Sequence, residues 1–254
     1  MKITVVKPGF ELVTPLCEFD ASDMIEHLER CGRVCYKSED KITPDSAERF
    51  IRAIVKSGHL SVIEHASVTV KFIGDRSMSH QLVRHRIAAF SQESQRYCDY
   101  GRLGLQVICP PTIAEIEPGA YECTGARRDS CESCRYWLAC FSSHTPVLTI
   151  PNRGLLWLDR IASAYAYYLE LREDGVPPED ARSVLPNAIK TEVVTTFNMR
   201  QWRHVFDERA LNKHAQWQIR EIMQDILVRL ASLFPCIFQD QMDRLVDMRA
   251  EESK

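Results

Sequence analysis

The sequence lacks a long apolar run, a strong net charge, internal repeats and low-complexity segments. No apolar stretch reaches the roughly 18 residues that a membrane-spanning helix needs, and the opening Met1-Lys2-Ile3-Thr4 has no signal-peptide pattern. The formal net charge of −3 provides no global field that would attract nucleic acid or an anionic membrane. We therefore expect a cytoplasmic protein that spans no membrane and binds no nucleic acid, in which any basic cluster is a local site.

The composition is that of a folded globular protein. With 254 residues, 45% hydrophobic and 26% charged, the chain can form one large domain or two small ones and is not disordered over most of its length. Helical apolar stripes dominate, and the few alternating stretches lie between them. The order predicts an α+β fold: a single domain with a central mixed or antiparallel sheet flanked by helices, including a long C-terminal helix.

The expected elements follow from apolar spacing and from capping residues. Strands are predicted at 3–6, 66–72 and 192–197. Helices are predicted from a Ser22 cap to residue 31, from a Thr43 cap to Gly58, and at 78–88, 155–172, 177–186, 199–206 and 215–233. Asn198 is the predicted cap of the helix at 199–206, and Pro235 is predicted to stop the last helix. The charged residues 249–254 are expected to be frayed.

Ten cysteines fall into two groups. Six are scattered among apolar or helical stretches, where a free thiol behaves as a small hydrophobe: Cys17, Cys31, Cys35, Cys98, Cys109 and Cys236. The other four, Cys123, Cys131, Cys134 and Cys140, lie within an irregular stretch at about 104–154 that we interpret as a cysteine-rich insertion. Cys131 and Cys134 have the spacing of a zinc knuckle, so a structural zinc is possible; reduced thiols and a Cys131–Cys134 disulfide are the alternatives.

The densest polar stretch is 81–97, QLVRHRIAAFSQESQRY. Long cationic side chains are costly to bury without partners, so a cluster this tight faces solvent or an anion. The predicted helix at 78–88 would group Gln81, Arg84 and His85 on one face. Ala88 and Ala89 between the basic and polar parts would let a flat ligand approach the backbone. The stretch predicts an anion pocket.

The residues of this stretch also resemble a known family. Arg84-His85-Arg86, seven further residues and Ser94 are similar to the RHRx7S signature of the flavin-dependent thymidylate synthases. The segments Glu64-His65, 182–186, 198–200 and 214–216 resemble further segments of that family in the same order. The likeness covers roughly 1–103 and 155–236, and the cysteine-bearing middle departs from it. It implies one domain of this family over 1–254.

The resemblance implies an enzyme that methylates dUMP to dTMP. The carbon would come from 5,10-methylenetetrahydrofolate, giving tetrahydrofolate, and the reducing equivalents from NADPH through FAD. The family also implies a homotetramer whose active sites are shared between subunits.

The resemblance assigns roles residue by residue. Substrate contacts are implied for Gln81, Arg84, Gln92, Ser94, Gln95, Arg96, Arg182 and Arg209, with Arg182 supplied by a neighbouring subunit. Cofactor contacts are implied for Ser67, Arg84, His85, Arg86, Ile87, Asn198, Arg200, His204 and His214. Arg209, His65 and Ser94 are the implied catalytic residues, His65 lying near flavin, nucleotide and folate. No metal is expected in the active site.

The chemistry of these residues agrees with the implied roles. Guanidinium groups make paired hydrogen bonds to phosphate and carbonyl oxygens. Ser94 has no evident base beside it in the motif, so it is expected to contact the nucleotide, while Arg209 polarises the uracil ring. The alternatives are a thymidylate synthase with a cysteine nucleophile, and a nucleotide-sensing or zinc-bearing nucleic-acid-binding protein.

Overall fold

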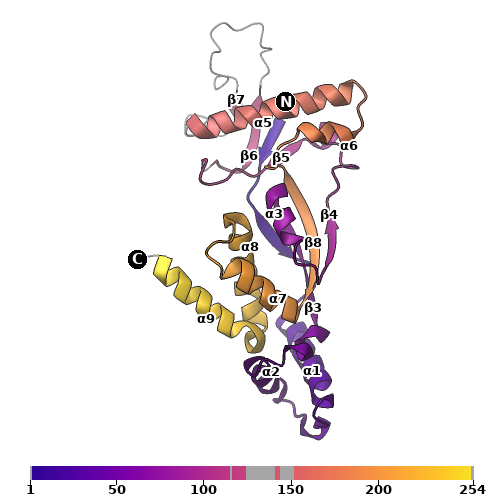
Figure 1. Ribbon diagram of the computed structural model, residues 1–254, viewed down its shortest axis with the longest axis vertical. Coiled ribbons are helices and arrows are strands. Elements are labelled where there is room, and N and C mark those ends of the chain that lie inside the picture. Colours follow the sequence, from indigo (N-terminus) through magenta and orange to yellow (C-terminus); the bar gives the residue numbers. More distant parts are fainter. Residues whose placement is uncertain (1, 115, 124–140, 144–151, 253–254) are drawn as a thin grey trace. The chain divides into compact units, whose positions relative to one another are not determined.

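The computed structural model describes residues 2–114, 116–123, 141–143 and 152–252. These residues form two compact units. The first contains 1–8, 73–79 and 92–192, and the second contains 9–72, 80–91 and 193–254. Helices and mixed sheets alternate along the chain, which confirms the α+β prediction (Figure 1).

The first unit is built on the sheet β5-β1-β6-β7. Its strands are β1 (Lys2–Val5), β5 (Leu105–Val107), β6 (Gly119–Cys123) and β7 (Phe141–Ser143). β1 is parallel to β5, pairing Ile3 with Leu105, and antiparallel to β6, pairing Ile3 with Tyr121. The sequence of 104–154 gave no prediction of β5, β6 or β7. Each of these strands is short and is stabilised by pairing with other strands, which local sequence preference does not reveal.

Helices cover this sheet with an apolar core. They are α4 (Tyr100–Leu103), α5 (Asn152–Glu173), α6 (Pro178–Ala181) and the 3₁₀ turn η5 (Arg182–Val184). Ile3, Val107 and Tyr121 of the sheet share one buried cluster with Leu158 and Tyr168 of α5. α5 confirms the helix predicted at 155–172, and the helix predicted at 177–186 is observed as two shorter pieces, with Arg182 in the second.

The second unit is mainly helical. Its helical elements are α1 (Glu18–Val34), η1 (Glu39–Lys41), α2 (Ala47–Lys56), η2 (Leu60–His65), α7 (Met199–Val205), the π-helix η6 (Phe206–Ala210), α8 (Trp217–Leu233) and α9 (Pro235–Glu252). α8 and α9 pack on each other (Figure 1). Gly58, at a φ of 75°, follows α2 and ends it as predicted.

A second sheet has the order β2-β3-β8-β4. Its strands are β2 (Gly9–Leu12), β3 (Ser67–Asp75), β8 (Lys190–Asn198) and β4 (Ala89–Gln92). β8 contains the predicted strand at 192–197, and β3 covers 67–72 of the strand predicted at 66–72; both are longer than expected. The boundary between the two units runs through β3, β8 and α3 (Arg76–Leu82).

Several predicted helix ends are wrong. α1 begins after Cys17 rather than Ser22, and α2 begins after Ser46 rather than Thr43. The Ser46 hydroxyl accepts a hydrogen bond from the Thr43 amide at 2.9 Å, so these residues form a turn before the helix. Pro235 begins α9 instead of stopping the chain's last helix, because proline fits the first helical turn, where no intrahelical amide bond is lost.

Residues 249–252 belong to α9, so the expectation that they are frayed is wrong; 253 and 254 lie outside the described residues. The helix continues to Glu252, and the Arg249 guanidinium donates to the side-chain oxygen of Gln224 at 3.1 Å. The buried residues Ile237, Gln241 and Leu245 lie at helical spacing. That spacing was visible in the sequence.

The six scattered cysteines are free thiols, as predicted. Cys236 is buried, but Cys17 and Cys35 are exposed, so only part of the group acts as small core hydrophobes. Burial raises the pKa of the Cys236 thiol to about 12. Cys131, Cys134 and Cys140 lie outside the described residues, so the zinc prediction concerns a part of the chain on which the structure gives no information.

Candidate functional site

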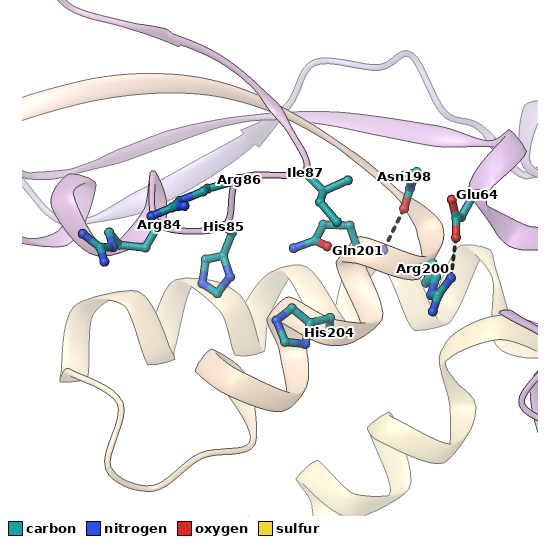
Figure 2. Close-up of a pocket in the computed structure, with 9 residues that line it drawn as sticks. All are labelled: Glu64, Arg84, His85, Arg86, Ile87, Asn198, Arg200, Gln201 and His204. Carbon is teal, nitrogen blue, oxygen red and sulfur yellow. Dashed lines mark hydrogen bonds and ion pairs between the residues drawn. The ribbon is translucent and has the colours of Figure 1, made fainter. Parts of the chain in front are cut away.

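The second unit contains a cavity of about 540 Å³. Its walls come from three places: the end of η2, the segment after α3, and the start of α7. The lining residues are Glu64, Arg84, His85, Arg86, Ile87, Asn198, Arg200, Gln201 and His204 (Figure 2). The cavity therefore gathers residues more than a hundred positions apart in sequence.

The basic wall is a turn and not the predicted helix. α3 ends at Leu82, six residues before the expected end at 88. The amides of Arg84 and His85 donate to the carbonyls of Gln81 and Leu82, at 3.3 and 3.2 Å, and the backbone then extends into β4. Because β4 pairs within the sheet, tertiary pairing overrides the helical spacing of the segment. His85 becomes buried while Arg84 and Arg86 stay exposed.

The opposite wall is the first turn of α7. Asn198 caps this helix as predicted, because its side-chain oxygen accepts from the Gln201 amide at 2.8 Å. Trp202 is fully buried and its indole nitrogen donates to the Val68 carbonyl at 3.2 Å. This bond and the ring contact with Phe197 at 4.8 Å hold α7 against the sheet. The helix phase then leaves Arg200 and His204 on the cavity side (Figure 2).

The cavity carries an excess of positive charge. Glu64 is the one acidic residue of the lining, and its carboxylate pairs with the Arg200 guanidinium at 2.5 Å. Among the described residues, the side chains of Arg84 and Arg86 have no hydrogen bond or ion pair. Three arginines against one glutamate leave two uncompensated positive charges. Such a lining fits a ligand with two negative charges, such as a diphosphate.

Arg209 lies beside this cavity in η6. This single-turn π-helix follows α7 directly, and such turns occur frequently at functional sites. The Arg209 Nε donates to His85 Nε2 at 3.1 Å, and one Nη donates to the Gln81 side-chain oxygen at 3.4 Å. The predicted catalytic arginine is therefore brought to two other predicted site residues.

His85 is the most perturbed group of the cavity. Its side chain is 8% exposed, and its ring meets that of His204 edge-on at 6.0 Å. Burial, followed by the charges of Arg209 and His204, lowers its pKa from 6.5 to about 4. The ring is consequently neutral at physiological pH and can accept a hydrogen bond.

In the first unit, the rest of the motif forms a separate cluster. The Gln92 amide donates to the hydroxyls of Ser79, at 3.0 Å, and Thr191, at 3.3 Å. The backbone amide of Arg96 donates to the Ser94 hydroxyl at 3.3 Å. Gln95 is half-buried on the same segment. Among the described residues, no base is hydrogen-bonded to the Ser94 hydroxyl, and its contact with the nucleotide stays a prediction.

Two predicted substrate ligands, Arg96 and Arg182, meet in this cluster. The Arg96 guanidinium pairs with the Glu179 carboxylate at 3.1 Å, and the Arg182 guanidinium donates to the Glu179 carbonyl at 2.9 Å. Both arginines thus contact Glu179 within one chain. Whether Arg182 serves a neighbouring subunit stays a prediction.

Glu93, which lies inside the motif, anchors it. Its carboxylate pairs with Lys190 at 3.2 Å and accepts from the Tyr100 hydroxyl at 3.0 Å. Lys190 also pairs with Glu192 at 2.7 Å. These contacts hold the segment carrying Ser94 and Arg96 against the start of β8.

Three predicted site residues belong neither to the cavity and its neighbour Arg209 nor to the cluster in the first unit. His65, Ser67 and His214 are exposed, at the end of η2, the start of β3 and the loop before α8. Sequence reasoning assigned no site role to Glu64 and Gln201, which line the cavity, or to Glu179, which contacts Arg96 and Arg182. Glu64 was visible as the neighbour of His65 in the matched segment, whereas Gln201 and Glu179 have no distinguishing signal in the sequence.

Comparison with known proteins decides the family. A family model described as thymidylate synthase complementing protein matches residues 20–236. A flavin-dependent thymidylate synthase of Geobacter sulfurreducens is 35% identical over 216 residues, covering 82% of this chain and 78% of that protein. The chain belongs to the flavin-dependent thymidylate synthase family. This confirms the resemblance drawn from the motifs.

Other relatives agree with this membership. A flavin-dependent thymidylate synthase of Mycobacterium sp. (strain JLS) is 36% identical over 229 residues, covering 88% of this chain and 82% of that protein. The crystal structure of the UMP/dUMP methylase PolB from Streptomyces cacaoi, bound with 5-Br dUMP, has a TM-score of 0.64 at 22% identity. It covers 92% of this chain and 95% of that one. At this identity the likeness shows a shared fold.

The described residues contain no group of three or more His, Cys, Asp or Glu side chains arranged to hold a metal ion. Across the same residues, no helix is long and apolar enough to span a membrane. Cys123, the first of the four clustered cysteines, ends β6.

Proposed function

We propose that this protein is an FAD-dependent thymidylate synthase. It methylates dUMP to dTMP, takes the carbon from 5,10-methylenetetrahydrofolate and uses NADPH as reductant. The observation that carries the proposal is the gathering of Arg84, His85, Arg86, Ile87, Asn198, Arg200 and His204 around one positively charged cavity. These are seven of the nine residues to which the family motifs assign flavin contacts.

The donor set of this cavity fits a flavin dinucleotide. Arg84 and Arg86, which have no partner among the described residues, suit the two charges of a diphosphate, and Asn198, Gln201 and the neutral His85 offer donors and acceptors for a polar ring. When bound, FAD would supply the hydride chemistry, which amino-acid side chains do not provide.

In this proposal the chain's own residues bind the nucleotide and polarise its uracil ring. Arg209 is the residue we expect to stabilise the negative charge that develops on the uracil ring, because its guanidinium is held in place before the reaction. Gln81 and Arg84 of the second unit, and Gln92, Ser94, Gln95, Arg96 and Arg182 of the first, are the proposed ligands of the nucleotide. The proposal assigns both groups to one nucleotide on the strength of the motifs.

The proposal retains three further predictions. We expect His65 near flavin and folate, a homotetramer with shared active sites, and a cytoplasmic location. The UMP/dUMP methylase PolB supports the choice of a pyrimidine nucleotide as substrate. The relatives named flavin-dependent thymidylate synthase favour this reaction over that of an enzyme with a cysteine nucleophile.

The test begins with the colour of the purified protein. It should be yellow or become yellow with FAD, bleach under NADPH without oxygen, and form dTMP from dUMP and methylenetetrahydrofolate. Replacing Arg209 with Gln should lower kcat by about 10²–10³, as for other lost charge-stabilising donors. Arg229→Gln, on the exposed face of α8, is the matched control. Colourless protein that binds no added FAD would overturn the proposal.

A further inference from the structure

The hydrogen-bond partners of Arg209 are both uncharged. The guanidinium donates to His85 Nε2 at 3.1 Å and to the Gln81 oxygen at 3.4 Å. Within the described parts of the chain, no carboxylate lies within 4.0 Å of it. Other half-buried arginines of the same unit are paired with acids: Arg33 pairs with Glu29 at 2.7 Å and Arg203 with Asp240 at 2.6 Å.

The choice of partner matters for charge. A carboxylate would orient a guanidinium but would also cancel its field at a nearby ligand, since opposite charges in contact largely neutralise each other at a distance. A neutral acceptor orients the same group and leaves its full charge. The half-buried Arg209 therefore presents an oriented and uncompensated cation.

His85 can play this part in only one tautomer. To accept at Nε2, the ring must be neutral and carry its proton on Nδ1. The surroundings favour the neutral ring: it is 8% exposed, with the edge contact to His204 at 6.0 Å and a perpendicular contact to Phe197 at 6.4 Å. Arg209 beside the ring further disfavours a second proton. The other charged residues of the cavity lining are Arg84, Arg86 and the ion pair of Arg200 with Glu64.

We propose that His85 is a positioning residue for Arg209, holding the guanidinium through its neutral Nε2 while leaving the positive charge available to the substrate. The proposal rests on the proposed function, in which Arg209 polarises the pyrimidine. It adds a role for the central histidine of the Arg84-His85-Arg86 motif that is separate from any flavin contact. Since His85 also lines the cavity, it links the cavity to Arg209 through one hydrogen bond.

The hydrogen bond itself can be tested without turnover. Nitrogen-15 NMR of the histidine side chains distinguishes the two tautomers, and the His85 signal is assigned by its loss in His85→Gln. We expect an Nδ1–H tautomer that does not titrate between about pH 5.5 and 8. In Arg209→Gln the tautomer preference should weaken, whereas His80→Gln, an exposed change on α3, should leave it unchanged. An Nε2–H tautomer, or ordinary titration of His85, would overturn the proposal.

Turnover supplies the second test. Glutamine can place an acceptor oxygen close to the position of Nε2, whereas leucine cannot. At saturating FAD, with bound flavin measured separately, His85→Leu should lower kcat by about 10–100-fold with a smaller change in KM for dUMP, and His85→Gln should recover most of the loss. The rate profile of the leucine variant should move to higher pH, because a misplaced Arg209 assists ionisation of the ring less.

The two proposals fail in different ways. If wild-type protein forms no dTMP, the proposed function fails, and the NMR experiment still decides whether His85 holds Arg209. If wild-type protein is active but the glutamine and leucine variants have equal kcat at full flavin occupancy, the positioning role is refuted. Circular dichroism of both variants shows whether a lost rate reflects lost folding.

Discussion

Glu64 is the cavity residue whose replacement should strengthen ligand binding. Its carboxylate is the one negative charge of the lining and holds Arg200 at 2.5 Å. If the cavity binds the FAD diphosphate, the Glu64 carboxylate repels the ligand and also neutralises Arg200, one of the cavity's cations. Glu64→Gln keeps the size of the side chain and removes the charge. We therefore expect tighter FAD binding, although most changes to a binding-site residue weaken affinity.

The size of the effect follows from the exposure of the pair. The side chains of Arg200 and Glu64 are 53% and 42% exposed, so water screens their interaction. Exposed pairs of this kind are worth about 0.2–1 kcal/mol, and repulsion of a nearby anion is of the same order. A gain of about 0.5–1 kcal/mol corresponds to a dissociation constant lower by a factor of about 2–5.

Quenching of flavin fluorescence on titrating apoprotein measures this constant. The gain should shrink as salt rises, since screening weakens both terms. Glu48→Gln removes the same charge from the exposed face of α2, where Glu48 pairs with Arg52 at 3.9 Å, and should leave FAD affinity unchanged. Arg200→Gln should weaken binding. If Glu64→Gln binds FAD more weakly than the wild type, or if Glu48→Gln increases FAD affinity equally, the electrostatic account of this cavity is refuted.

Three further predictions concern stability, each measured by urea unfolding. Hydrogen bonds from Arg172 chiefly lower the Asp99 pKa to about 2. The stabilisation by the Asp99 carboxylate is therefore full above about pH 4 and is lost as pH falls through 2, so Asp99→Asn should cost about 1–2 kcal/mol at pH 7 and markedly less near pH 2. Gly32→Ala should cost about 1–3 kcal/mol, since its Cβ would lie 2.6 Å from the Phe50 ring. Stability should fall by at most about 3 kcal/mol as pH drops from 6.5 to about 4, because protonation of His85 favours the unfolded chain, and His85→Gln should remove this loss.

Local signals in the sequence were sufficient for much of the fold. Asn198 was identified as a cap because a short polar side chain before an apolar stripe satisfies free amides at a helix start, and its bond to the Gln201 amide confirms this. The alternation around Val68 and Val70 identified β3 in the same way. Such signals depend on a few neighbouring residues, which is why they could be interpreted without the fold.

Element ends depended on distant residues. The helix spacing of 78–88 was real, yet α3 ends at Leu82 because the following segment pairs in a sheet. Pro235 is compatible with either the end of one helix or the start of the next. The packing of α9 on α8 stabilises a helix that starts at Pro235. Local preference is worth only a few tenths of a kcal/mol per residue, so tertiary burial and pairing outweigh it.

The sequence by itself determined the family and the kinds of side chain available, because the order of Arg84, His85, Arg86, Ser94 and the later motif residues is written directly in the chain. It could not show which charges are cancelled. Only the tertiary structure shows these pairings: Arg200 with Glu64, Arg96 with Glu179, and the hydrogen bond from Arg209 to the neutral His85. Electrostatic effects depend on distances and burial between residues far apart in sequence, and only the folded chain sets those.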